Sequence, residues 1–233
     1  MSCHRPILHA ESAEFAVPRT RVKGLSIVTT SRLYLNPEGH QRFTLHVQLQ
    51  HIEPPIWRRI EVEGTESLRK LHHILQAAFG WEDSHLHDFL VDGMTYAMFE
   101  VDGVLDFADP GTTADDRKVR LQKVLKPGSR FLYRYDFGDG WDHAIVVEKV
   151  EIVESEPWGA AQVTDGARAC PPEDVGGPPG YGAFLNTLSN DPNSEEAEHY
   201  RNWVGPGFDA ERFDLRAANA TLLRMASNRW GNR

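Results

Sequence analysis

Three Asp-Gly dipeptides constrain the fold of this chain more than any other feature. They lie at Asp92-Gly93, Asp102-Gly103 and Asp139-Gly140, and each is flanked by residues typical of strands. Asp-Gly favours the two-residue turn that joins antiparallel strands, because both turn residues need a positive φ. The strands predicted around these turns cover about 86–91, 94–101, 104–107, 130–137 and 141–153. The central part of the chain is therefore expected to form an antiparallel sheet.

Two further strands and a helix are predicted before the first turn. Apolar residues at Phe43, Leu45, Val47 and Leu49 alternate with polar ones, which indicates a strand buried on one face. A second, less regular alternation runs from Ile56 to Val62. Apolar residues spaced three and four apart then predict a helix at about 67–79, with Thr65 or Ser67 as its N-cap and Gly80 as its end.

The C-terminal third is predicted to be a stiff loop followed by helices. Five Pro and six Gly between Pro157 and Gly182 argue against a helix or strand through that segment. Helical spacing follows from Tyr181 to Leu188, from Ser194 to Trp203 and from Asp214 onward. The expected class is α+β: a mainly antiparallel sheet built from Asp-Gly hairpins, one helix packed early and several helices at the C-terminus.

Composition bounds the organisation of the chain. With 233 residues, 40% of them apolar, we expect residues 1–40 to be an N-terminal extension, 41–226 a single α+β domain and 227–233 a tail. The net charge of −9 disfavours nucleic-acid binding. Two cysteines cannot build a disulfide scaffold, and there is no apolar run of membrane-spanning length, so we expect a cytoplasmic protein.

The third hairpin offers a candidate catalytic pair. If Asp139 and Gly140 are the two turn residues, Asp136 lies opposite His143. A carboxylate beside an imidazole orients the ring and suits a general base or a metal ligand. A structural ion pair beside a tight turn explains the same two residues.

The first hairpin offers a candidate metal site. His85 and His87 lie on one face of a strand, and the register of the Asp92-Gly93 turn places His85 opposite Glu100. Two imidazoles and one carboxylate suit zinc, manganese or iron. If the two hairpins adjoin, these residues share a pocket with Asp136 and His143, covered by Glu173 or Asp174 of the long loop. The alternative is two separate structural polar pairs.

A third group of residues is predicted to contribute to binding. Trp57 is followed by Arg58 and Arg59, which could grip a phosphate or carboxylate, although alternate residues of a strand point to opposite faces. The remaining candidates surround the third turn and the proline-rich loop: Asp139, Trp141, Glu173 and Asp174.

Four motifs, in order, resemble one known family. They are Pro54–Arg59, Trp81–His87, Tyr135–His143 and Arg168–Gly177. They are similar to the signature blocks of the plasmid pRiA4b open-reading-frame-3-like family, whose members also appear as insertion-element passenger proteins with a resolvase-type label. The resemblance covers about residues 43–225 and implies an α+β fold carried on plasmids and insertion elements. It implies no activity, and the resolvase label does not fit, because this chain lacks the basic DNA-binding tail of a serine recombinase.

Three functions are compatible with these residues. The first is a mobile-element-associated recognition or adaptor module that binds a partner protein or small ligand, because no complete catalytic signature is present in the sequence. The second is a metal-dependent hydrolase or nuclease that uses the His and Asp residues, with Zn, Mn or Fe as the cofactor. The third is a DNA-binding accessory protein. The sequence does not decide whether the protein is an enzyme.

Overall fold

A computed structural model describes residues 39–98, 111–154 and 161–228. The predicted N-terminal extension and tail fall almost entirely outside these ranges, as do Asp102-Gly103 and the strand expected at 104–107. The described part of the chain forms one eight-stranded sheet with helices, which confirms the α+β class. None of its helices combines the length and the apolar character that crossing a bilayer requires.

The sheet is antiparallel except at one edge. Its strands follow the order β5-β4-β3-β6-β7-β1-β2-β8, and only β4 and β5 pair in parallel. The strands are β1 (His40–Leu49), β2 (Trp57–Glu63), β3 (His87–Val91), β4 (Met94–Ala97), β5 (Thr113–Asp115), β6 (Arg130–Tyr135), β7 (Trp141–Val153) and β8 (Ala161–Ala167). β5 was not among the predicted strands, because it has only three residues and two of them are polar. It is followed by η1 (Asp116–Lys118) and α2 (Leu121–Val124).

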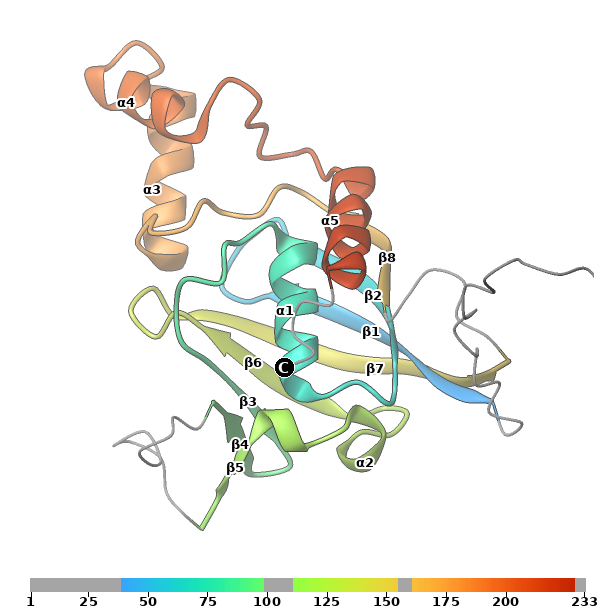
Figure 1. Ribbon diagram of the computed structural model, residues 1–233. Coiled ribbons are helices and arrows are strands. Elements are labelled where there is room, and N and C mark those ends of the chain that lie inside the picture. Colours follow the sequence, from blue (N-terminus) through green and yellow to red (C-terminus); the bar gives the residue numbers. More distant parts are fainter. Residues whose placement is uncertain (1–38, 99–110, 155–160, 229–233) are drawn as a thin grey trace, which may run out of the picture. The chain divides into compact units, whose positions relative to one another are not determined.

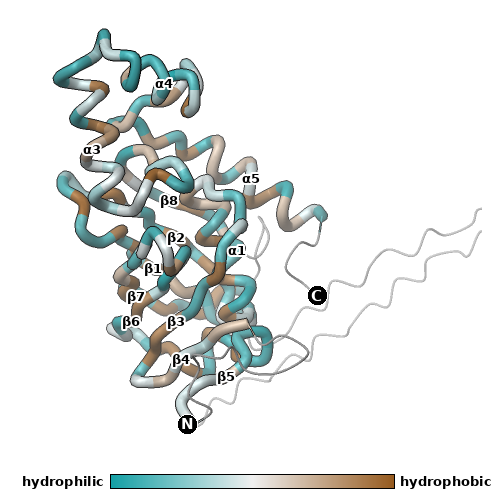
Figure 2. The backbone as a smooth tube through the Cα atoms, turned by 90° about the vertical axis from the view of Figure 1, so that its left-hand side faces the viewer, coloured by the Kyte–Doolittle hydropathy of each residue, from teal (hydrophilic) through white to brown (hydrophobic). Residues whose placement is uncertain are grey.

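One face of the sheet carries the hydrophobic core. Phe43, Leu45, Val47 and Leu49 of β1 are all buried, as their alternation predicts. Against this face packs α1 (Leu68–Phe79), which begins at the N-cap Ser67 and ends at Gly80 in the left-handed conformation. Figure 2 shows α1 and α5 (Leu215–Ser227) on the same side of the strands, and α5 contacts both α1 and β8.

The proline-rich segment contains more helix and strand than predicted. It contains β8 and the start of α3 (Gly177–Asn190), so the expectation that neither helix nor strand crosses it is wrong. The prolines do not prevent the helix, because Pro178 and Pro179 occupy its first turn, where the backbone N–H has no helical partner. α4 (Glu195–Val204) follows, with Ser194 as its N-cap. α3 begins beside the turn between β6 and β7 (Figure 1).

The two Asp-Gly hairpins that the structure describes differ in how accurately their register was predicted. The Asp92-Gly93 hairpin pairs Phe89 with Tyr96 and Asp88 with Ala97, as expected for a two-residue turn. In the third hairpin Tyr135 pairs with Trp141, and His143 pairs with Tyr133. The predicted pairing of Asp136 with His143 is therefore wrong.

The reason lies in the turn itself, which spans five residues from Asp136 to Gly140. The N–H of Gly140 donates to the carbonyl of Asp136 (2.7 Å), and the Asp136 carboxylate accepts from the N–H groups of Gly138 and Asp139. These local bonds form a wider turn than Asp-Gly alone indicates.

Candidate functional site

Two pockets lie on either side of the segment that follows α1. The first, with a volume of about 470 Å³, is named the histidine pocket and is lined chiefly by Arg69, His72, His73, Asp83, His85 and His87. The second, of about 440 Å³, is named the aromatic pocket and is lined chiefly by Phe79, Trp81, Glu82, Glu173, Asp174 and Trp203. Ser84 contributes to both pockets. The two pockets therefore adjoin at the residues just after α1.

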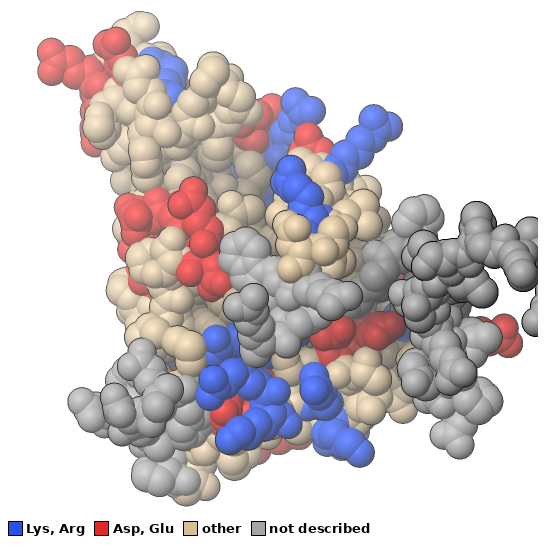
Figure 3. Space-filling model, in the orientation of Figure 1, with Lys and Arg blue, Asp and Glu red and all other residues tan. Residues whose placement is uncertain are grey.

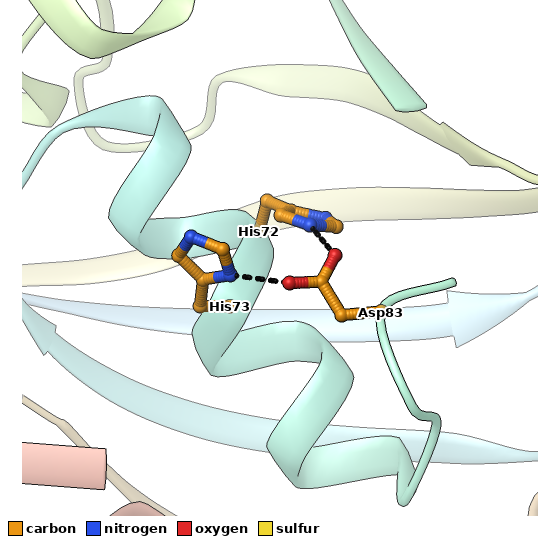
Figure 4. Close-up of side chains that lie close together, drawn as sticks. All are labelled: His72, His73 and Asp83. Carbon is orange, nitrogen blue, oxygen red and sulfur yellow. Dashed lines mark hydrogen bonds and ion pairs between the residues drawn. The ribbon is translucent and has the colours of Figure 1, made fainter. Parts of the chain in front are cut away.

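In the histidine pocket, one carboxylate lies between two imidazoles. Asp83 Oδ1 is 2.5 Å from His72 Nε2, and Asp83 Oδ2 is 2.9 Å from His73 Nδ1. Figure 4 shows both imidazoles leaving α1, with Asp83 reaching them from the following segment. His72 is buried, and its Nδ1 lies 2.8 Å from the hydroxyl of Tyr133. Both ring nitrogens of His72 thus have partners within the protein.

A third imidazole, that of His87, extends this network into the core. The His87 ring stacks on the His72 ring at 3.5 Å between centroids, and His87 Nε2 lies 3.0 Å from Asp116 Oδ2. Asp116 also accepts from Arg69 Nε at 2.9 Å. This arrangement ties α1, β3 and η1 together through buried polar groups.

The protonation states in this network follow from burial. Burial lowers the pKa of His72 to about 3 despite its hydrogen bond to Asp83, and it also lowers the pKa of His87. Burial alone would raise the pKa of Asp83, but the hydrogen bonds from His72 and His73 hold it below its usual range. Near neutral pH, a neutral His72 therefore donates to an ionised Asp83.

A separate cluster forms where the two pockets meet. His85 Nε2 lies 3.2 Å from Asp174 Oδ1 and 3.7 Å from Asp136 Oδ2, and the three donor atoms lie within 4.8 Å of one another. Among the described residues, no well-formed hydrogen bond reaches His85 Nε2. The cluster joins the segment before β3, the β6–β7 turn and the segment before α3. It therefore presents one imidazole and two carboxylates to a common point.

Backbone groups hold the Asp136 carboxylate and the segment that carries Asp174 in place. Asp136 Oδ1 accepts from the N–H groups of Gly138 and Asp139, which leaves Oδ2 directed at His85. Asp136 and Asp174 both have positive φ, a conformation that non-glycine residues adopt where the surrounding structure imposes it. The segment carrying Asp174 is fastened to the turn, because Gly176 N–H donates to Asp139 Oδ2 at 3.1 Å.

Glu173 lies beside this cluster, on the wall of the aromatic pocket. Its Oε1 accepts from the Glu82 N–H at 2.9 Å and from the Tyr135 hydroxyl at 2.8 Å. Burial, followed by the hydrogen bond to Glu173, raises the pKa of Tyr135, so its hydroxyl remains a donor. Glu173 thus places a hydrogen-bonded side chain next to the three-residue cluster.

The structure divides the residues predicted as metal ligands and catalytic groups. His85 joins Asp136 and Asp174, whereas His87 takes Asp116 as its partner, and Glu100 lies outside the described residues. His143 is fully buried and contacts the rings of Phe79 and Trp81 edge-on. Burial lowers its pKa to about 3. His143 therefore belongs to the aromatic core, away from the carboxylate of Asp136.

Arg58 and Arg59, which were predicted to grip a ligand, have partners within the protein instead. Arg58 is buried and donates to the carbonyl oxygens of Trp57, Ala78, Ala167 and Arg168. On the opposite face of β2, Arg59 pairs with Glu148 at 2.8 Å, and its guanidinium lies over the Trp57 ring. Trp141 is buried against Trp81.

Several residues of the site were not predicted from the sequence. The largest omission is His72, with its partners His73, Asp83 and Tyr133. One signal was available, because His72 and Gln76 interrupt the buried face of α1 one helical turn apart. Polar residues at core positions normally have buried partners, but those partners lie on other elements and could not be named from spacing.

Comparison with known proteins decides the family. The family model described as plasmid pRiA4b ORF-3-like protein matches residues 41–217. The chain belongs to this family. One relative, the uncharacterized protein y4hQ of Sinorhizobium fredii, is 36% identical over 185 residues, which cover 78% of this chain and 88% of the relative.

A solved structure shares the fold of this plasmid pRiA4b ORF-3-like protein. The crystal structure of a protein of unknown function, MM3350 from Methanosarcina mazei Go1, superposes with a TM-score of 0.66 at 31% identity. The match covers 76% of this chain and 97% of the archaeal chain. Since both relatives are described without an activity, the geometry of the site must carry any functional argument.

Proposed function

We propose that this protein is a metal-dependent hydrolase whose divalent metal is held by His85, Asp136 and Asp174. One observation carries the proposal: the donor atoms of these residues converge within 4.8 Å of one another where two pockets meet. One imidazole and two carboxylates form a ligand set suited to Zn²⁺, Mn²⁺ or Fe²⁺. Three protein ligands would leave a coordination position for water, which is typical of catalytic sites.

The spacing of the donor atoms in the cluster fits metal coordination better than it fits a hydrogen bond. Metal–ligand bonds of about 2.1 Å in a tetrahedral site separate neighbouring ligand atoms by about 3.4 Å. The two separations at His85 Nε2, 3.2 and 3.7 Å, bracket that value. By contrast, His72 Nε2 and Asp83 Oδ1 are only 2.5 Å apart, which is the distance of a short hydrogen bond. His72 is therefore satisfied within the protein.

The surrounding residues suit hydrolysis of an uncharged carbonyl compound such as an amide or an ester. A bound metal would supply a polarised water molecule. Glu173, held by the Tyr135 hydroxyl, is the nearby carboxylate that can accept a proton from this water as its oxygen attacks the carbonyl carbon. When the carbon–nitrogen bond of an amide breaks, the same group returns the proton to the departing amine. The net charge of −9 disfavours binding of a phosphodiester and therefore the nuclease alternative.

Elemental analysis of protein purified without an affinity tag tests the proposal. We expect about one equivalent of metal per chain, reduced at least about tenfold in the His85→Ala and Asp136→Asn variants. His199→Ala, which removes an exposed imidazole on α4, is the matched control and should keep its metal. Metal that is lost in Asp83→Asn but retained in His85→Ala would place it in the other cluster and overturn the assignment.

A recognition module is the second candidate. Its support is the presence of two adjoining pockets of about 440 and 470 Å³, large enough for small ligands. On this hypothesis the protein is associated with a mobile element, binds a small molecule or a segment of a partner protein, and catalyses no reaction. Metal binding at His85 without hydrolysis of any amide or ester substrate would favour this candidate over the enzyme.

A further inference from the structure

We infer that the aromatic pocket binds an organic cation, an ammonium or guanidinium group on an apolar stem, such as the Lys or Arg side chain of a peptide. This inference deepens the proposed function, because it names the substrate class of the site at the rim of the pocket. It rests on the shape, the lining residues and the charge of the pocket.

Aromatic rings form the apolar part of the pocket. Trp81 is held rigidly, because its indole N–H donates to the carbonyl of Pro171 at 3.1 Å and its ring stacks on Phe79 at 5.7 Å. Across the pocket, Trp203 of α4 is 43% exposed, a large fraction for a tryptophan side chain. Since Phe79 and Trp81 are themselves buried, the aromatic surface that the pocket offers to a ligand stem comes chiefly from Trp203.

The charged residues of the pocket are all negative. Glu82, Glu173 and Asp174 line it, and among the lining residues that the structure describes none is Lys, Arg or His. Figure 3 shows Asp and Glu side chains gathered on this face, below α3 and α4. Like charges around a concave surface concentrate counter-ions, so this pocket attracts cations and repels anions.

The nearest buried cation does not cancel this charge. The Arg58 guanidinium lies 5.0 Å from the centroid of the Phe79 ring, and its N–H groups donate to four backbone carbonyls. Arg58 is only 1% exposed and does not line the pocket. Its donors are therefore directed at the backbone and not at the pocket.

Aromatic rings and carboxylates together favour cations over neutral ligands of the same shape. A cation over an indole ring is attracted by the negative face of the ring, and a carboxylate adds a charge-assisted hydrogen bond. Asp174 belongs both to this pocket and to the His85 cluster. A peptide with its cationic side chain in the aromatic pocket would thus place a backbone amide near the proposed metal.

Calorimetric titration of the protein with three small amides tests this inference. The probes are N-acetyl-argininamide, its neutral analogue N-acetyl-citrullinamide and the anionic N-acetyl-glutamate amide. We expect the arginine compound to bind at least about fivefold more tightly than the citrulline compound, and the glutamate compound to bind most weakly. Equal binding of the arginine and citrulline compounds, or preference for the anion, would overturn the inference.

Variants locate the binding in the pocket. Glu82→Gln and Trp203→Leu should each weaken binding of the arginine compound by at least about threefold, since the first removes an exposed charge and the second an aromatic ring. Glu154→Gln, at an exposed position after β7, is the matched control. Unchanged affinity in both pocket variants would contradict the assignment.

The same titration in the His85→Ala variant separates the two proposals. Cation binding should persist there, because His85 does not line the aromatic pocket. Loss of metal with retained cation selectivity would therefore support the pocket while leaving the metal to be judged by elemental analysis. Stoichiometric metal without cation selectivity would support the metal site and reject the pocket.

Discussion

At the scale of the residue, neighbouring side chains have opposite roles. Arg58 and Arg59 are adjacent in the sequence, but alternation along β2 buries the first and leaves the second half-exposed. Burial lowers the pKa of Arg58 to about 10, so it remains charged near neutral pH. Its charge is matched by carbonyl dipoles that connect β2, the end of α1 and the segment after β8. Arg58 therefore serves the fold.

Replacing Arg58 tests this role. Arg58→Met should lower the free energy of unfolding by about 3 to 5 kcal/mol, because it leaves buried carbonyl groups without donors. Arg59→Met should lower it by about 1 kcal/mol or less, since an exposed ion pair contributes little. Urea unfolding followed by circular dichroism measures both. Similar losses in the two variants would contradict the structural role of Arg58.

At the scale of the element, the start of α3 positions the proposed site. Gly177 has φ of +67°, and a Cβ atom there would lie 2.1 Å from the carbonyl oxygen of Asp139. Only glycine lets this helix approach the β6–β7 turn so closely. The same contact places Asp174 over Asp136 and His85. The close approach at Gly177 thus positions one of the proposed metal ligands.

Two alanine substitutions in α3 should have opposite effects. Gly177→Ala should destabilise the protein by about 2 kcal/mol or more, because positive φ and steric overlap act together. It should also weaken metal binding, since Asp174 moves with the helix start. Gly182→Ala, with no atom within 4 Å of the added Cβ, should stabilise α3 by about 0.5 to 1 kcal/mol. Thermal unfolding and metal analysis measure these effects, and equal behaviour of the two variants would refute the close-approach argument.

At the scale of the whole molecule, buried neutral histidines couple stability to pH. Burial lowers the pKa of both His72 and His143 from 6.5 to about 3 in the folded protein. Above pH 6.5 the imidazoles are neutral in both states, and their contribution to stability is complete. Between pH 6.5 and about 3 the unfolded chain binds protons that the folded protein does not. Stability is therefore lost progressively as the pH falls through this window.

The expected loss is about 1.4 kcal/mol per pH unit for each histidine. Urea unfolding at several values between pH 7 and pH 5 measures this slope. His143→Gln should reduce it by about one proton, whereas the exposed control His199→Gln should leave it unchanged. A slope that is the same in both variants, or stability that rises on acidification, would contradict neutral burial of His143.

Much of the fold was predictable from local patterns. The alternation of β1, the apolar stripe and caps of α1 and the Asp92-Gly93 hairpin depend on residues close together in the chain. The strands of the third hairpin were also predicted, but its register was not, because an aspartate side chain bonded to its own turn widened the connection. The start of α3 was also missed, since prolines that exclude a helix interior are accepted in its first turn.

The candidate site needed the tertiary structure. The sequence by itself determined the family motifs, the α+β class and most of the side chains that now form the site, because these follow from residue type and local period. Packing decided that His85 meets Asp136 and Asp174 while His87 turns to Asp116 and His143 enters the core. These partners come from segments far apart in the chain, and long-range contacts depend on how the elements pack, which local spacing does not encode.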